Sequence, residues 1–381
     1  MARAAAKVVF AGGFGLCCLP SFAAEWAVAP LFTFDADHQS NRTFRAIGQS
    51  SESLSAGVDL GVVRRTETSE FSLLPHYYAQ RFSGDSIPDI DDQRLMAALR
   101  LDLERGQLYF DAEYADESTL TTELAETGLI RADASRTTRG TSAAWTFAHS
   151  DSREFSASAS FQDVSYSGGF ATQLNGYRYA AVSANERFMF SPRWALTLGT
   201  FVSNFDSPTR GSRSGERGIS LGFTFAWTER LNMAGTLGGS RRDIDGMQSN
   251  GTTGDFSLQY RGETRTVDFT AAHSLVPFGT GVLTERNTAE LSLRQDFNSR
   301  LSATARVGFS RNEDAGFGIT FDSRTYRFAD SELRWQINET WSTAIAGGYA
   351  DATVLGAPET FGGWSVALRS YWSPARRVFG H

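Results

Sequence analysis

Beyond its first two dozen residues, this chain has neither cysteine nor lysine. Cys17, Cys18 and Lys7 all lie in the amino-terminal segment, so the remainder forms no disulfide and no cysteine-ligated metal site. It keeps 34 basic side chains (36 less Arg3 and Lys7), all of them arginine, against 43 acidic ones, which gives a net charge of −9. An acidic chain repels phosphate backbones, which argues against nucleic acid as a partner.

The amino-terminal segment has the pattern of an export signal. A basic start precedes an apolar stretch over Val8–Leu19 and a small-residue cleavage site at Ser21–Ala24. Residues 1–24 are therefore predicted to be a signal peptide that is removed. The apolar stretch is too short to span a bilayer. A lipoprotein is disfavoured because Leu16, immediately before Cys17, is large where lipoprotein processing takes a small residue.

Long apolar runs are also missing. No run of eighteen apolar residues follows the signal, and the mean hydropathy is −0.28, which excludes helical membrane spans. The chain instead alternates: between Ile219 and Trp227 every odd position is apolar and every even one is small or polar. This is the period of a β-strand with two different faces.

About eighteen segments show this alternation. In hydrocarbon every backbone amide needs a partner within the protein, so a sheet with apolar outer faces has to close on itself. The sequence predicts an all-β fold, a transmembrane antiparallel up-and-down β-barrel over residues 25–373, followed by a short periplasmic tail at 374–381. An aromatic content of 13% fits girdles at the two membrane interfaces. The predicted strands are 26–36, 52–64, 69–82, 93–104, 106–116, 140–149, 153–166, 177–190, 193–205, 217–228, 230–242, 253–262, 264–276, 286–297, 299–312, 323–337, 340–353 and 362–373.

The connections are alternately short and long, which is the layout of outer-membrane barrels with tight periplasmic turns and long outer loops. Arg105-Gly106 and Asn338-Glu339 are examples of the short class. The predicted long connections are 38–51, 83–92, 116–139, 167–176, 206–216, 242–252, 277–285, 313–322 and 353–361.

Three predicted strands, 69–82, 177–190 and 323–337, break the alternation. Leu73 and Leu74 are adjacent apolar residues, and Tyr326 and Phe328 have the opposite parity from Leu333. A β-bulge would reconcile them with the pattern. Alternatively, some of these segments are not strands, in which case the barrel has sixteen strands.

The inward faces carry many charges. A lipid-facing charge near the midplane costs about 2 to 4 kcal/mol, so charged residues within strands are expected to face the lumen. A lumen lined in this way is too polar for a dry core, and barrels of this size enclose water. The alternative is that the charges only solvate one another as a cross-strand ladder. The predicted lumen-lining residues are Arg100, Asp102, Glu104, Asp111, Glu113, Asp268, Glu290, Arg294, Asp296 and Arg306.

The connection 116–139 is the longest and carries charges of both signs. Its charged residues are Glu123, Glu126, Arg131, Arg136 and Arg139. In its place and mixed charge it resembles the third outer loop of general porins, which folds into the lumen and narrows it. The resemblance implies a constriction loop, and display at the surface is the alternative.

Catalytic and metal-binding patterns are weak. The acidic turn at 83–92 offers several carboxylates, but it lacks the EF-hand spacing and is interpreted as a solvated turn rather than a calcium site. The histidines form no metal-ligand pair, and no G-x-S-x-G motif frames a serine. We therefore expect no enzyme, no metal and no cofactor.

Overall, the chain resembles Gram-negative outer-membrane β-barrels. The segments Tyr78–Leu95 and Tyr114–Leu124 resemble barrels encoded beside exopolysaccharide and exosortase systems, which implies a part in moving or anchoring surface polysaccharide. The last predicted strand, with Trp364, Val366, Leu368 and Trp372 on one face, resembles the closing strand that the barrel-assembly machinery recognises. The implied partners are that machinery, outer-membrane lipid and lipopolysaccharide.

These observations predict a bacterial outer-membrane barrel with a charge-lined aqueous pore for polar solutes or surface polysaccharide. The alternative from the binding class is a non-conducting barrel whose outer loops bind polysaccharide or other surface ligands. Step-like ion conduction in a planar bilayer separates the two.

Overall fold

The computed structural model describes residues 24–42, 50–83, 87–126, 134–168, 174–314, 324–354 and 360–380. The predicted signal peptide, residues 1–24, lies outside the described residues except for Ala24. No helix within these ranges is long and apolar enough to cross a membrane.

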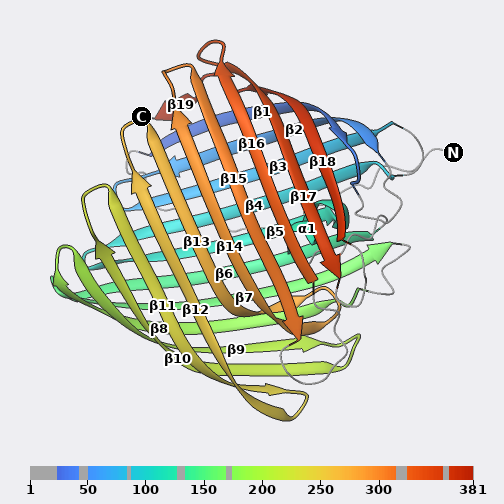
Figure 1. Ribbon diagram of the computed structural model, residues 1–381. Helices are drawn as coiled ribbons and strands as arrows, with labels where there is room; N and C mark the ends of the chain where they lie inside the picture. Colours follow the sequence, from blue (N-terminus) through green and yellow to red (C-terminus); the bar gives the residue numbers. More distant parts are fainter. Residues whose placement is uncertain are drawn as a thin grey trace.

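Eighteen long strands form one antiparallel sheet in which each strand pairs with the next and β1 pairs with β18, so the sheet closes into a barrel (Figure 1). This confirms the predicted fold class, with eighteen strands rather than sixteen. The strands are β1 Glu25–Gln39, β2 Ser51–Arg65, β3 Ser69–Phe82, β4 Ile90–Leu103, β5 Gly106–Ser118, β6 Ala134–Ser150, β7 Arg153–Gly168, β8 Tyr177–Ser191, β9 Trp194–Ser207, β10 Ser212–Ala226, β11 Leu231–Ile244, β12 Met247–Arg261, β13 Arg265–Phe278, β14 Val282–Asp296, β15 Leu301–Asp314, β16 Arg324–Gln336, β17 Trp341–Val354 and β18 Thr360–Trp372, with one helix, α1 Thr119–Glu126, between β5 and β6.

The segment predicted as a periplasmic tail is part of the sheet. After β18, residues 373–376 leave the strand, and β19 (Arg377–Gly380) pairs with Glu25–Val28 of β1. Sequence alternation ends at Trp372, and a four-residue strand is too short to show a period of its own. The described chain therefore remains paired to within one residue of its carboxyl end.

The two faces of the sheet differ as the alternation predicts. Residues directly opposite each other in neighbouring strands share a face, and the pairs Leu221–Leu237 and Ile345–Leu368 place large apolar side chains on the outside. Leu237 is 76% exposed there. Near the periplasmic end, Trp341 and Trp372 stack with ring centroids 5.7 Å apart as part of an aromatic girdle. A closed sheet with this exterior spans a membrane, and the barrel belongs to the bacterial outer membrane.

The irregular strands β3 and β16 contain no bulge. β3 keeps one register with β2 and β4, so Leu73 faces the lipid and Leu74 faces the lumen. β16 is also regular, and Tyr326 and Phe328 stack on each other inside the barrel, with centroids 5.9 Å apart. Of the three strands that break the alternation, only β8 has a register shift. It lies in the pairing with β9, between Met189 and Ser191 at the periplasmic end.

Three of the connections predicted to be long outer loops are tight turns. β9–β10 turns at 208–211, β11–β12 at 245–246 and β13–β14 at 279–281. Asp245 and Gly246 have φ of 52° and 84°, the left-handed values of a two-residue hairpin turn. The prediction overlooked this Asp-Gly signal, and the strands extend into the regions that it assigned to loops.

Candidate functional site

The lumen is the candidate site, and most of the predicted charged residues line it. The cross-strand register turns Arg100, Asp102, Asp111, Glu113, Asp268, Glu290, Arg294, Asp296 and Arg306 to the face opposite the exposed apolar residues. Glu104 is the exception, because it lies in the periplasmic turn between β4 and β5.

Many of these charges are paired within the wall. The Arg306 guanidinium donates to both carboxylate oxygens of Asp330, at 3.0 and 2.9 Å. Arg94 donates to Glu113 at 2.6 Å. These pairs form the cross-strand ladder that was the alternative to charges facing a water-filled lumen. The paired side chains are nevertheless partly exposed to solvent.

Around Glu332 of β16 lies a network that the sequence analysis missed. Glu332 accepts hydrogen bonds from Arg369 at 2.8 Å and from Arg334 at 3.1 Å. Arg369 also lies 3.9 Å from Asp35 of β1, across the closing seam. The parity of β16 carries the signal, because Glu332 and Arg334 alternate with the outward-facing Leu333 and Trp335.

The lumen charges gather on one arc of the wall. The strands from β13 through β18 to β5 contribute the charges described above. Opposite that arc, the inward positions in the middle of β8–β12 are mostly small or hydroxylated, with Phe201 and Asp255 as exceptions, and they include Ser183, Thr197, Ser220, Thr236 and Thr253. The middle of this wall therefore carries fewer charges than the arc opposite it.

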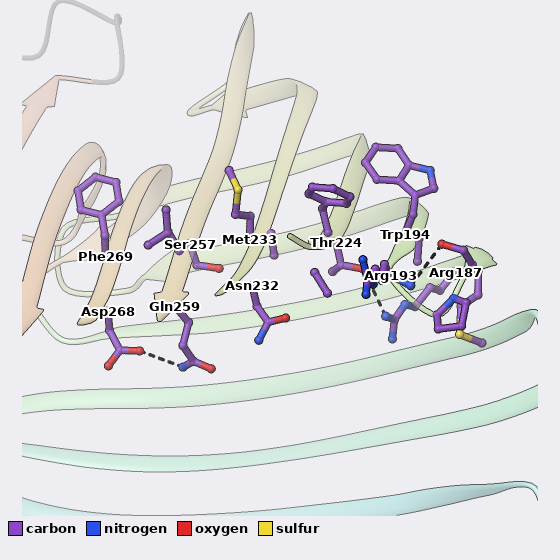
Figure 2. Close-up of a pocket in the computed structure, with 18 of the residues that line it drawn as sticks. Arg187, Arg193, Trp194, Thr224, Asn232, Met233, Ser257, Gln259, Asp268 and Phe269 are labelled. Atoms are coloured by element: carbon purple, nitrogen blue, oxygen red, sulfur yellow. Dashed lines mark hydrogen bonds between the residues drawn. The ribbon is translucent and has the colours of Figure 1, made fainter. Parts of the chain in front are cut away.

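This less charged wall becomes more polar near its periplasmic end. In Figure 2, Phe269, Met233 and Trp194 extend from one side of the sheet, while Asp268 and Gln259 extend from the other. Gln259 donates to Asp268 at 2.9 Å. The lumen-facing side chains of this region border a concavity of about 400 Å³.

The connection predicted as a constriction loop does enter the barrel. Glu123 of α1 is 1% exposed. It accepts a hydrogen bond from the hydroxyl of Tyr166 on β7 at 2.9 Å, and Arg136 of β6 lies 3.9 Å away. Leu120 packs against Ile87 and Ile90, at the extracellular end of β4. α1 thus lies against inward-facing side chains of two separate parts of the wall.

The other residues predicted for this loop do not all lie inside the barrel beside α1. Strand pairing runs to Ser118 in β5 and resumes at Ala134 in β6, so the connection is shorter than predicted. Arg139 lies on β6 opposite Asp163, on the outer face, and is not part of the constriction. Glu126 ends α1, nothing is described of its side chain, and Arg131 lies outside the described residues.

A second segment, the β13–β14 hairpin, also crosses the lumen and was not predicted to do so. The pairing of β12 with β13 ends at Gly254–His273, and above that point the hairpin turns inward. At its tip the backbone oxygens of Gly279 and Thr280 accept hydrogen bonds from Asn175, at 2.8 and 2.9 Å. Asn175 immediately precedes β8, so the tip reaches the wall beyond β12.

The hairpin packs through an apolar cluster. Leu275 and Leu283 lie against inward-facing side chains of four other strands, and all six residues are buried: Val164, Tyr177, Phe205, Ile244, Leu275 and Leu283. The sequence signal was available, because the end of the predicted strand 264–276 and the predicted outer loop 277–285 carry the apolar residues Leu275, Val276, Phe278, Val282 and Leu283 around a Gly-Thr-Gly turn. In an exposed outer loop these apolar side chains would all be in contact with water.

Beneath the cluster lies a buried charge centre. Arg242 of β11 is 1% exposed and donates to Glu216 of β10 at 3.2 Å. It also donates to Glu285 of β14 on the hairpin, and to the backbone oxygen of Thr252 at 3.2 Å. One guanidinium therefore joins the inner face of the wall to the hairpin that crosses it. Together, α1 and the hairpin cover inward-facing side chains of the wall in the extracellular half of the barrel.

The described carboxylates of the acidic turn are held by hydrogen-bond donors of neighbouring strands and of α1. Arg81 donates to Asp91 at 2.7 Å, and Asp92 accepts hydrogen bonds from Ser118 and Thr121 at 2.7 and 2.9 Å. Asp85 lies outside the described residues. Within the described ranges no three histidine, cysteine, aspartate or glutamate side chains are grouped so that they could hold a metal ion.

We predict that replacing residues 119–133 with a short Gly-Ser link raises the single-channel conductance roughly 1.5-fold or more, because α1 lies against the inner side of the wall and takes space from the lumen. The matched control is Arg139→Gln, which alters a charge assigned to the same loop but placed outside the barrel. Equal conductance of the folded loop variant and the wild type would remove α1 from the constriction.

No protein-family model matches this sequence, and no curated protein matches it. Among solved structures, OccAB4 of Acinetobacter baumannii is 11% identical over 94% of this chain and 99% of the other, with a TM-score of 0.46. OccK2 (OpdF) of Pseudomonas aeruginosa is 12% identical over 91% and 98%, with a TM-score of 0.49. The FrpB iron transporter of Neisseria meningitidis is 9% identical over 88% and 64%, with a TM-score of 0.48. The closed pairing and apolar exterior described above, rather than these distant similarities, establish an outer-membrane β-barrel.

Proposed function

We propose that this barrel is a passive channel for small polar solutes, with a charge-lined lumen that α1 and the β13–β14 hairpin narrow from the extracellular side. The observation that carries the proposal is the lumen wall itself. Charged groups such as Arg306, Asp330 and Glu332 remain partly exposed inside a barrel whose outer face is apolar. Charges of this kind are retained where they meet water, and a water-filled path across a membrane conducts.

The narrowing favours small solutes over a polysaccharide strand. The segments that resemble barrels of exopolysaccharide systems, 78–95 and 114–124, meet through Asp92, which accepts hydrogen bonds from Ser118 and Thr121. These contacts give the two segments a structural role at the constriction. The proposal includes no catalytic step and no cofactor.

The decisive experiment is a planar bilayer recording of the purified, folded barrel. Step-like conductance supports a channel, and liposome swelling with sugars of increasing size would then give the size limit. A folded barrel that inserts but stays silent would instead support the binding-class alternative, in which the outer loops attach surface ligands. Passage of long oligosaccharides without a size limit would favour the polysaccharide role.

We predict that the triple substitution Arg306→Gln, Arg334→Gln and Arg369→Gln shifts ion selectivity toward cations by about threefold or more, because charged pore linings set preference. Asp330, Glu332 and Asp35 would lose their cationic neighbours. Reversal potentials in a salt gradient measure this shift. Arg311→Gln is the control, since Arg311 lies on β15 with Arg306 but faces outward.

A further inference from the structure

Two arginines face each other on the outside of the barrel. Arg217 of β10 and Arg241 of β11 are direct cross-strand partners on the same face as Ile219 and Leu237. Like charges directly opposite each other in a sheet are destabilising. The pair therefore costs stability unless an anion lies between or above the two guanidinium groups.

No carboxylate within the described residues neutralises this pair. Neither arginine has a carboxylate oxygen within salt-bridge distance, and Arg241 donates only to the side-chain amide of Gln248. Four other outward-facing arginines toward the extracellular side do have such partners. Arg178 lies 3.0 Å from Asp163, Arg81 2.7 Å from Asp91, Arg311 2.6 Å from Glu313 and Arg213 3.2 Å from Asp206.

The depth of the pair suits a lipid headgroup. On the membrane side, Ile219 is the next outward residue after Arg217 and Leu237 is the second after Arg241, and they are 71% and 76% exposed. Alternate residues along a strand are about 7 Å apart, so the guanidinium groups lie just above the apolar band. Beyond them toward the extracellular side, the outward positions are polar or small, such as Asn204, Gly215 and Asp243.

The surface around the pair is hollowed. A recess of about 300 Å³ is bordered on the outer face by Arg217, Arg241, Gln248, Asn204 and Gly215, and also by the carboxylate residue Asp243. Gly239, between Arg241 and Leu237 on the outer face, has nothing within 4 Å of the position where a Cβ would lie. The recess thus offers two guanidinium forks and two side-chain amides against one carboxylate, Asp243, which lies on the extracellular side of the two arginines.

We propose that Arg217 and Arg241 bind the phosphate group of an outer-leaflet lipid of the lipopolysaccharide type, whose acyl chains lie over Ile219 and Leu237. Arginine forks bind phosphate through paired, charge-assisted hydrogen bonds. The bound phosphate replaces the repulsion between the two arginines by attraction to both. This site lies outside the lumen and does not depend on the proposed channel.

The test compares the wild-type barrel with Arg217→Gln/Arg241→Gln in neutral detergent. Native mass spectrometry measures the binding of bisphosphorylated lipid A, and the same lipid without its phosphates is the second probe. We expect the double variant to bind the phosphorylated lipid about tenfold more weakly or worse. Arg178→Gln, at a paired arginine on the same face, should bind it as the wild type does. Equal binding of the phosphorylated and unphosphorylated lipids by the wild type would overturn the proposal.

A second measurement is the melting temperature, for which the order of the two proteins should reverse when lipid is added. Without lipid, the double variant should melt at the same temperature as the wild type or higher, because it lacks the arginine–arginine repulsion. With phosphorylated lipid present, the wild type should become the more stable of the two. Stabilisation of the wild type by inorganic phosphate to the same extent as by lipid A would show an anion site without lipid recognition. A double variant that melts lower without lipid would contradict the repulsion on which the site rests.

Discussion

A barrel in which Leu275–Glu285 is replaced by an Asn-Gly turn is expected to conduct about twofold more current or better than the wild type, since conductance follows the narrowest cross-section. The replacement joins Ser274 to Arg286, which are direct cross-strand partners, so a two-residue turn can close the shortened hairpin. It removes the apolar contacts of Leu275 and Leu283 and the segment that crosses the lumen.

Single-channel recordings measure this effect, and electrophoresis with and without heating verifies that the variant is folded. Arg178→Gln, which changes an ion pair on the outer face, is the control and should leave conductance unchanged. If the folded, shortened barrel conducts as the wild type does, the hairpin does not limit the passage of ions.

Arg242→Met is expected to lower the free energy of unfolding by about 3 to 5 kcal/mol, because it leaves one buried and one partly buried carboxylate without their cation. Glu216 and Glu285 both depend on this guanidinium. Urea unfolding of the barrel in detergent, followed by tryptophan fluorescence, measures the loss.

The origin of that loss is tested by rescue. Adding Glu216→Gln and Glu285→Gln to Arg242→Met removes the uncompensated charges and should restore most of the stability. Arg178→Met, which breaks an exposed pair, should cost about 1 kcal/mol or less. A triple variant as unstable as Arg242→Met alone would mean that packing, not charge, makes Arg242 important.

The strand number and the orientation of most lumen charges could be predicted because each strand shows its two faces locally. Arg306 and Asp111 needed only the parity of their own strands. Arg139 was misplaced for a different reason: the prediction ended its loop at that residue, whereas pairing extends β6 back to Ala134. Strand ends depend on pairing with neighbours, and alternation fades where outward residues leave the hydrocarbon.

The inward turn of the β13–β14 hairpin shows a limit of alternation itself. Leu275 and Leu283 have the parity of lipid-facing residues, but the inner side of the neighbouring wall covers them. Parity says that a side chain is on the outer face of its own strands. It does not say whether that face meets lipid or a second layer of protein, which depends on contacts between residues far apart in the sequence.

The departure of that hairpin leaves one side of Met247–Thr253 in β12 without a neighbouring strand within the described residues. An open edge of this length invites pairing between two copies of a protein and, from there, aggregation. The edge carries Gln248, Ser249, Asn250 and Gly251, which are poor strand formers with little apolar surface. The composition of this unpaired edge therefore disfavours pairing between two barrels. Valine or isoleucine at these positions would favour such pairing.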